Sequence, residues 1–195
     1  MDLKNINDNP LSREWEERYA KQPPDVQKKL DELKEAPSMN QLEVIKRKRV
    51  VPQTGDVFLA SPVKGIYFYG IVLNDHPNDI FGGDLFVIIL FKTKTKEQTM
   101  NNFKLDFDNI LTAPRIVGKE YWTRGYFYNI GKTDLNVDNI DYGFYDVIDR
   151  RYYDEYEEEL DHIPRYLGIF GAATIIGVAY DIWVELIIDS SLLED

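Results

Sequence analysis

The sequence predicts an α+β protein that is mainly β: a small, strongly curved antiparallel sheet or an SH3-like barrel with an N-terminal helical arm. Apolar residues recur at helical spacing near the start of the chain, whereas after residue 49 they form strand-length runs between turn signals. Hydrophobic residues make up 44% of the 195 residues and aromatic residues 13%, which is the composition of a folded chain. We therefore expect residues 1–48 to form the arm and residues 49–195 to form a β-rich domain.

Two short amphipathic helices are predicted in the arm. Ser12 is the expected N-cap of the first helix, which the pair Pro23-Pro24 ends. Asp25 is the expected N-cap of the second helix, which Pro37 closes. The apolar stripes are Leu11, Trp15 and Tyr19 in the first helix and Val26, Leu30 and Leu33 in the second. These stripes predict that both helices pack on the rest of the chain.

Three apolar runs predict the central strands. The turn signal Gly55-Asp56 leads into residues 57–60, and later turns lead into residues 66–73 and 85–91. The last two runs are apolar on both faces, as in strands that are covered on two sides. A small sheet that curls and closes on itself would explain this pattern. Gly70 would permit a bend or bulge in the second run.

The remaining elements follow from weaker patterns. Residues 103–107 alternate between apolar and charged side chains, which predicts a half-buried strand, and residues 144–148 predict another. The aromatic residues crowded between 117 and 130 indicate core and sheet faces. Residues 167–180 carry no charge, but fourteen residues are fewer than the roughly 20 that span a bilayer. We expect a buried strand and turn there, or a closely packed helix, and no membrane partner.

Composition and motifs predict a binding protein rather than an enzyme. The chain has no cysteine, and its two histidines, His76 and His162, have no partner at metal-ligand spacing. Serine-hydrolase elbows, phosphate loops and dinucleotide fingerprints are missing from the sequence. We therefore predict no catalytic residue, no metal and no cofactor. The first residues lack the basic segment followed by an apolar run that is typical of a secretory signal. A cytoplasmic location is therefore expected.

Charge is distributed unevenly along the chain. The formal net charge is -11, and residues 131–195 hold 16 acidic residues against 4 basic ones. An acidic third of this kind repels phosphates and favours basic partners. The basic run at residues 46–49 is short, so no nucleic-acid partner is predicted.

Tyrosines lie within the acidic region and predict a partner-binding surface there. Aromatic anchors beside charged groups are typical of protein interfaces. Alternatively, these tyrosines are half-buried strand residues beside a solvated acidic loop. The predicted partner-binding residues are Tyr152, Tyr153, Asp154, Glu155, Tyr156, Glu157, Glu158, Glu159 and Asp161.

One block of the sequence resembles a known family. Residues 52–60 read Pro-Gln-Thr-Gly-Asp-Val-Phe-Leu-Ala, and residues 67–73 read Tyr-Phe-Tyr-Gly-Ile-Val-Leu. This pair of strands resembles the immunity protein 26 family of bacterial polymorphic toxin systems. The resemblance implies an immunity-like β-rich domain in a cytoplasmic protein that binds and neutralises a cognate protein toxin. The family has no catalytic or toxin-contacting motif that can be transferred to this chain.

Two other function classes remain open at this point. The Gly-Asp-hydrophobic opening also resembles SH3-like ribonuclease toxins of plasmid-maintenance systems. Such a relative would need basic residues converging on a concave surface, for which Arg115, Lys119 and Arg124 are the candidates. A non-catalytic adaptor is the third class.

Overall fold

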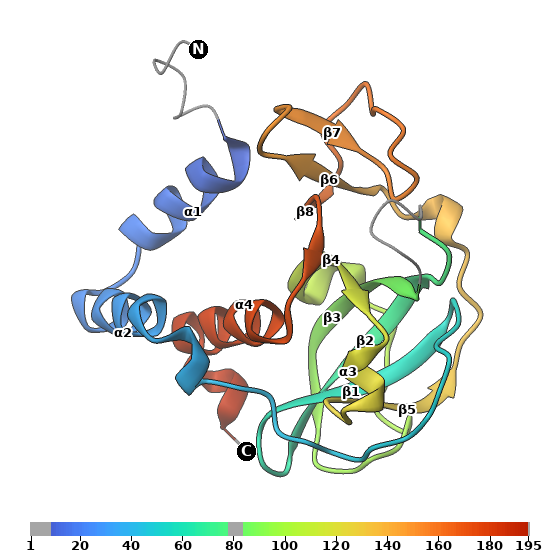
Figure 1. Ribbon diagram of the computed structural model, residues 1–195. Helices are drawn as coiled ribbons and strands as arrows, with labels where there is room; N and C mark the ends of the chain where they lie inside the picture. Colours follow the sequence, from blue (N-terminus) through green and yellow to red (C-terminus); the bar gives the residue numbers. More distant parts are fainter. Residues whose placement is uncertain (1–8, 78–83, 195) are drawn as a thin grey trace.

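The computed structural model describes residues 9–77 and 84–194, and its elements form two sheets and four α-helices within those ranges (Figure 1). The chain begins with helices α1 (Pro10–Ala20) and α2 (Pro24–Glu35) and the short 3-10 helix η2 (Pro37–Met39). An extended segment without helix or strand then leads to the first strand. The N-terminal helices pack through Leu30 and Leu33 against Val184, which lies near the C-terminus.

The larger sheet has six strands in the order β5-β1-β2-β3-β4-β9. Every neighbouring pair is antiparallel except β4 and β9, which are parallel. Its strands are β1 (Asp56–Val63), β2 (Ile66–Asn74), β3 (Leu85–Thr95), β4 (Ile110–Gly118), β5 (Phe127–Lys132) and β9 (Ala172–Ala173).

A second sheet of three strands follows in the order β7-β6-β8. Strand β6 (Tyr142–Asp146) pairs antiparallel with β7 (Arg151–Tyr153) and parallel with β8 (Tyr166–Ile169). The remaining helices are α3 (Glu120–Thr123), α4 (Ile175–Ile188), η4 (Phe107–Asn109), η5 (Val137–Asn139) and η6 (Ser190–Leu193).

The large sheet is covered on both faces, which explains its two-sided apolar runs. In β1, Phe58 joins a core cluster that includes buried residues of α4, whereas its neighbour Val57 joins a second cluster with Phe144 of the small sheet. Successive strand residues point to opposite faces, so both sets are buried. Gly70 leaves room for the Phe58 ring, since a Cβ there would lie 2.3 Å from Cζ of that ring.

The architecture confirms a mainly β, α+β protein but not a barrel. Strands β5 and β9 lie at the two edges of the large sheet, and among the described residues neither sheet closes on itself. The two-sided apolar runs arise instead from α4 on one face and the small sheet with its loops on the other. An open sheet that is covered on both faces buries the same strands that a closed barrel would bury.

Several local predictions need correction. Asn9, not Ser12, caps α1, because its side chain accepts hydrogen bonds from the backbone N–H groups of Leu11 at 3.0 Å and Ser12 at 3.4 Å. Helix α2 begins at Pro24, so Asp25 lies inside it and no side chain caps it. The proline at the first helical position sets the start of each helix.

Residues 103–107 do not form a strand. They form a loop that ends in η4, yet Phe103 and Phe107 still contact the core, with ring centroids 6.0 and 5.6 Å from Phe91. The alternation therefore did not predict strand pairing, and it predicted burial only in part, because Leu105 between the two rings is 40% exposed. The predicted strand at residues 144–148 begins and ends two residues earlier, as β6.

The uncharged run at residues 167–180 contains both of the expected alternatives. It supplies most of β8, all of β9 and the first six residues of α4. Thr174 caps α4 by accepting a hydrogen bond from the Gly177 N–H at 3.1 Å. Among residues 9–77 and 84–194, no helix is both long and apolar enough to cross a bilayer.

Candidate functional site

The predicted partner-binding residues lie in β7 and in the loop that follows it. We call residues 154–161 the acidic loop. Asp154 shapes its start, because one carboxylate oxygen accepts hydrogen bonds from the backbone N–H groups of Tyr156 at 2.8 Å and Glu158 at 2.9 Å. The Asp154 N–H in turn donates to the Glu158 carbonyl at 3.0 Å. The segment is thus a closed turn and not a helix.

Two residues of the acidic loop fasten it to the large sheet. The amide of Asn74, at the end of β2 and only 8% exposed, donates to Glu155 Oε1 at 2.8 Å and to the Tyr156 hydroxyl at 2.7 Å. The hydroxyl of Tyr142 donates to the same Glu155 oxygen at 2.5 Å. Burial first, and then the charge of Glu155, raises the pKa of Tyr142. The hydroxyl therefore keeps its proton and remains a donor.

The outer carboxylates of the acidic loop face solvent. Glu158, Glu159 and Asp161 are all exposed. The Glu159 carboxylate forms an ion pair with Arg151 of β7 at 2.7 Å, on the solvent-exposed side of that strand. Glu157 is half-buried and has a left-handed backbone, with φ of 66°. The loop is therefore held on its inner side and presents its charge on the outer side.

The tyrosines of this region differ in their surroundings. Tyr152 and Tyr153 are half-buried strand residues, whose rings pack against Tyr145 with centroids 5.4 Å apart and Phe170 with centroids 5.3 Å apart. Tyr156 is 50% exposed even though its hydroxyl accepts the bond from Asn74. Of the three, Tyr156 offers the largest exposed ring surface to a partner.

His162 has two carboxylate partners, one adjacent in the sequence and one 21 residues away. Its Nε2 lies 2.9 Å from Asp141, and its Nδ1 lies 3.2 Å from Asp161. The hydrogen bond to Asp141, followed by that to Asp161, raises the pKa of His162. The same bond to His162 lowers the pKa of Asp141. Within the part of the chain that the structure describes, no group of three or more ligating side chains suits a metal ion.

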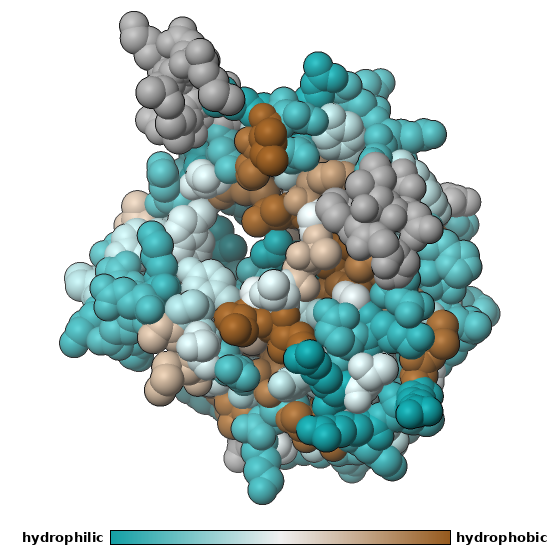
Figure 2. Space-filling view, viewed as in Figure 1, coloured by the Kyte–Doolittle hydropathy of each residue, from teal (hydrophilic) through white to brown (hydrophobic). Residues whose placement is uncertain are grey.

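A groove of about 860 Å³ runs between α1 and the small sheet. One wall carries Leu11 and Trp15 of α1, and the other carries Val147, Ile163 and Ile169. These three aliphatic residues are 52%, 63% and 40% exposed, and Ile148 beside them is 85% exposed. Figure 2 shows the hollow, with hydrophobic residues along its margin. Such a concentration of exposed aliphatic surface is typical of a binding surface.

Two ion pairs from α4 line the floor of the groove. Arg18 of α1 lies 2.5 Å from Glu185, and Arg115 of β4 lies 2.6 Å from Asp181. Burial raises the pKa of Asp181, and the charge of Arg115 counteracts that rise. Because each acid has a cation beside it, the floor of the groove is close to neutral.

The basic residues considered for an RNA site do not share one free surface. Arg115 is committed to Asp181, and Lys119 pairs with Asp84 at 3.2 Å. Arg124 is exposed and lies just after α3. Within the described ranges these cations therefore offer no shared phosphate-binding cluster.

Sequence reasoning missed the exposed aliphatic residues. Val147 and Ile148 were expected to complete a strand, but β6 ends at Asp146 and both lie in the turn toward β7. The signal that could have located this turn is Asp146, whose carboxylate accepts from the backbone N–H groups of Ile148 at 2.6 Å and Asp149 at 3.0 Å. Asp is favoured in turns for this bond.

Comparison with known proteins identifies one family. The family model described as Immunity protein 26 matches residues 53–155, just over half of the chain. No curated protein and no solved structure matches the chain. The matched region begins just before β1 and ends within the acidic loop, so it contains β1 to β7 but neither α1 nor α4.

Proposed function

The chain belongs to the immunity protein 26 family, and from that premise we propose that it binds a cognate protein toxin and neutralises it without catalysis. The family match over residues 53–155 is the observation that carries this proposal. The protein would act in the cytoplasm of the cell that produces the toxin, where it would protect that cell.

The acidic loop is the proposed contact surface for the toxin. Its exposed carboxylates, at Glu158, Glu159 and Asp161, suit a basic surface on the toxin. Complementary charge speeds the encounter of two proteins and orients them as they meet. Because Glu155 and Tyr156 are held by Asn74, the loop is already ordered before it binds. Less conformational entropy is then lost on association.

Apolar side chains close to the acidic loop would supply the centre of the interface. Ile163 follows Asp161 by two residues and shares the groove with Val147. Interfaces combine a desolvated apolar centre with a charged rim, and most of the binding energy comes from the centre. The exposed aliphatic residues and the carboxylates together offer this combination.

A neutralisation assay tests the proposal. The chain would be produced together with the toxin domain encoded by the neighbouring gene, and growth and complex formation would be measured. We expect growth to be restored and the two proteins to elute together on size exclusion. If the chain folds but neither binds the toxin nor restores growth, the proposal is wrong.

A further inference from the structure

Four consecutive cations lie in the extended segment between η2 and β1. We call Lys46, Arg47, Lys48 and Arg49 the basic run, and all four residues are exposed. Residues 44–55 contain no acidic residue. Among the residues that the structure describes, none of the four cations forms an ion pair with a carboxylate. The run therefore presents its charge to solvent without compensation from its own segment.

The turn after α3 holds the start of the basic run in place. The Gly125 carbonyl accepts hydrogen bonds from the backbone N–H groups of Ile45 at 2.8 Å and Lys46 at 3.3 Å. Gly125 has φ of 87°, and a Cβ there would lie 2.8 Å from the Arg47 nitrogen. Only glycine accommodates that conformation and that contact without strain. The first two cations of the run are therefore fixed against this turn.

The same turn brings a fifth cation to the basic run. Arg124 directly precedes Gly125, where it is the C-cap of α3, and it is exposed. Within the described part of the chain, it has no carboxylate partner. Lys46 lies over the ring of Tyr128, which follows in β5, with its Nζ 5.6 Å from the ring centroid. We call the basic run together with Arg124 the basic patch.

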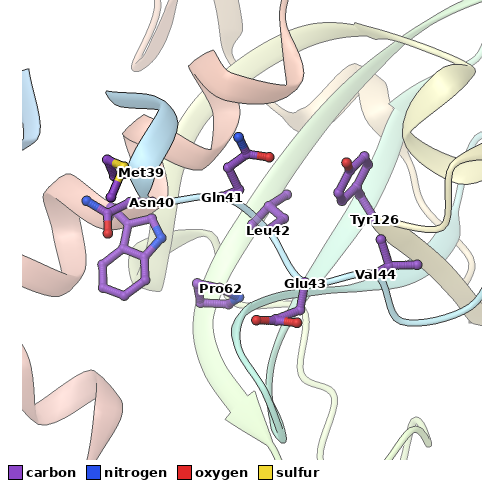
Figure 3. Close-up of a pocket in the computed structure, with 9 residues that line it drawn as sticks. Met39, Asn40, Gln41, Leu42, Glu43, Val44, Pro62 and Tyr126 are labelled. Atoms are coloured by element: carbon purple, nitrogen blue, oxygen red, sulfur yellow. The ribbon is translucent and has the colours of Figure 1, made fainter. Parts of the chain in front are cut away.

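The acidic residues closest in sequence to the basic patch are Glu43 and Glu120. Figure 3 shows the Glu43 side chain directed toward Pro62, on the other side of its segment from Tyr126. The Glu120 carboxylate lies against Gly118, where it occupies the space that a Cβ would fill. Neither carboxylate forms an ion pair with a cation of the patch. The patch is thus a local concentration of positive charge on an acidic protein.

The size and surroundings of the basic patch favour a short acidic ligand. Four residues of chain extend over at most about 14 Å. Because charges are screened beyond about 8 Å at physiological ionic strength, a short ligand responds mainly to the patch itself. A long RNA would continue onto the rest of a chain whose net charge is -11. Lys46 also covers one face of the Tyr128 ring, on which a base would otherwise stack.

We propose that the basic patch binds a short acidic segment of a partner protein, whose carboxylates pair with the basic run and with Arg124. Arginine suits this task, since its planar guanidinium can bind both oxygens of a carboxylate. Binding uses exposed side chains only, because the backbone at Ile45 and Lys46 is already bonded to Gly125. In Figure 1 the run passes below β1 and β5, whereas β7 lies at the opposite end of the molecule. The basic patch is therefore separate from the acidic loop and does not depend on the proposed toxin.

A model peptide tests the proposal with the full chain. The probe is a fluorescein-labelled peptide of four Glu-Gly repeats, and the matched control peptide has glutamine in place of glutamate. We expect fluorescence anisotropy to show about tenfold tighter binding of the acidic peptide at low salt, because the patch attracts carboxylates. Equal binding of the two peptides, or no binding of either, would overturn the proposal. Tighter binding of a uridine dodecamer than of the acidic peptide would also contradict it.

Two variants test whether the basic run and Arg124 act together. Lys48→Gln and Arg124→Gln each remove one exposed cation, and each should weaken binding of the acidic peptide about threefold. Lys29→Gln, which removes an exposed cation from α2, is the matched control and should leave the affinity unchanged. Thermal unfolding of each variant would confirm that the fold is retained. If Arg124→Gln binds the peptide as tightly as the unmodified chain, or if Lys29→Gln weakens binding equally, the proposed patch is wrong.

Discussion

Asn74 connects the end of a central strand to the acidic loop through a single amide group. Its nitrogen donates to both Glu155 and Tyr156, and the residue is nearly buried. Removal of a buried hydrogen-bonding group costs on the order of 1–3 kcal/mol when its partners are left unsatisfied.

We predict that Asn74→Ala lowers the free energy of unfolding by about 1–2 kcal/mol, because Glu155 and Tyr156 lose a buried partner. The acidic loop should also become a site of early proteolytic cleavage. Urea denaturation and limited proteolysis followed by mass spectrometry would measure both effects. Asn101→Ala, at an exposed residue, is the control. Full stability together with an uncut loop would show that this amide does not hold the loop.

His162 gives the acidic region a dependence on pH. Its pKa is raised by Asp141 and Asp161, so in the folded chain the proton is retained above the ordinary histidine value of about 6.5. The contribution of His162 to folding stability is fully present below its pKa in the unfolded chain. This contribution is lost as the pH rises through its pKa in the folded chain. The lowered pKa of Asp141 adds a contribution that is lost as the pH falls through the folded carboxyl value.

An NMR titration of the His162 imidazole should therefore give a midpoint above that of the same histidine in urea-unfolded chain. Asp141→Asn should lower the midpoint in the folded protein, because it removes the larger of the two causes. Asp161→Asn should lower it less. A midpoint that is the same in folded and unfolded chains would refute the pairing in solution.

At the scale of elements, α1 is attached to the molecule mainly by its C-terminal end. The helix has 11 residues and none of them is buried. Isolated helices shorter than about 12–15 residues are marginal in water, so tertiary contacts must stabilise it. Arg18, bound to Glu185 of α4, and the rings of Trp15 and Tyr19 provide those contacts.

We predict that Arg18→Gln destabilises the protein by about 1–2 kcal/mol, because Glu185 is left as a largely buried carboxylate without its cation. Hydrogen exchange of α1 should accelerate more than that of β2. The control is Lys28→Gln in the exposed pair with Glu32, which should change stability by less than about 0.5 kcal/mol. The double variant Arg18→Met with Glu185→Leu should recover stability. A loss in the double variant as large as in Arg18→Gln would mean that the ion pair is not the cause.

At the scale of the whole molecule, the acidic and the apolar surfaces should affect toxin binding at different steps. Exposed charges act mainly on association through the long-range field, whereas buried apolar contacts act mainly on dissociation. The acidic loop and the exposed aliphatic residues therefore predict separable kinetic effects.

Replacement of the outer carboxylates (Glu158→Gln, Glu159→Gln, Asp161→Asn) should lower the association rate with a basic toxin about tenfold at low salt. The dissociation rate should change little, and the salt dependence of association should become flatter. Stopped-flow measurements at two salt concentrations would show this. The matched control removes three exposed charges from the N-terminal helices, at Glu16, Glu17 and Glu35. If both sets change association equally, only net charge matters.

Ile163→Ser tests the apolar part of the same proposed interface. An apolar anchor buried by the toxin should raise the dissociation rate about tenfold or more when it is lost, with little change in association. Surface plasmon resonance with the immobilised toxin domain would measure both rates. Ile176→Ser, at an exposed residue of α4, is the control, since its side chain is 41% exposed and does not line the groove. An unchanged dissociation rate would exclude Ile163 from the contact.

The sequence by itself determined the features that depend on near neighbours. The strands near residues 57–60, 66–73 and 85–91 were predictable because their apolar runs and flanking turns are local signals. Both N-terminal helices were predictable for the same reason, although their caps were not. The family block at residues 52–73 was also recognisable, and the family match covers all of it except Pro52.

Only the tertiary structure decided which groups meet. Asn74 and Glu155 are 81 residues apart, and Arg18 and Glu185 are 167 residues apart, so no spacing rule connects them. The burial of both faces of the large open sheet likewise depends on α4 and the small sheet, which cover opposite faces. Periodicity reports that a residue is buried, but a buried face can be covered by many partners with similar free energy. The choice among them is made by the packing of the whole chain, which is why the groove was not visible in the sequence.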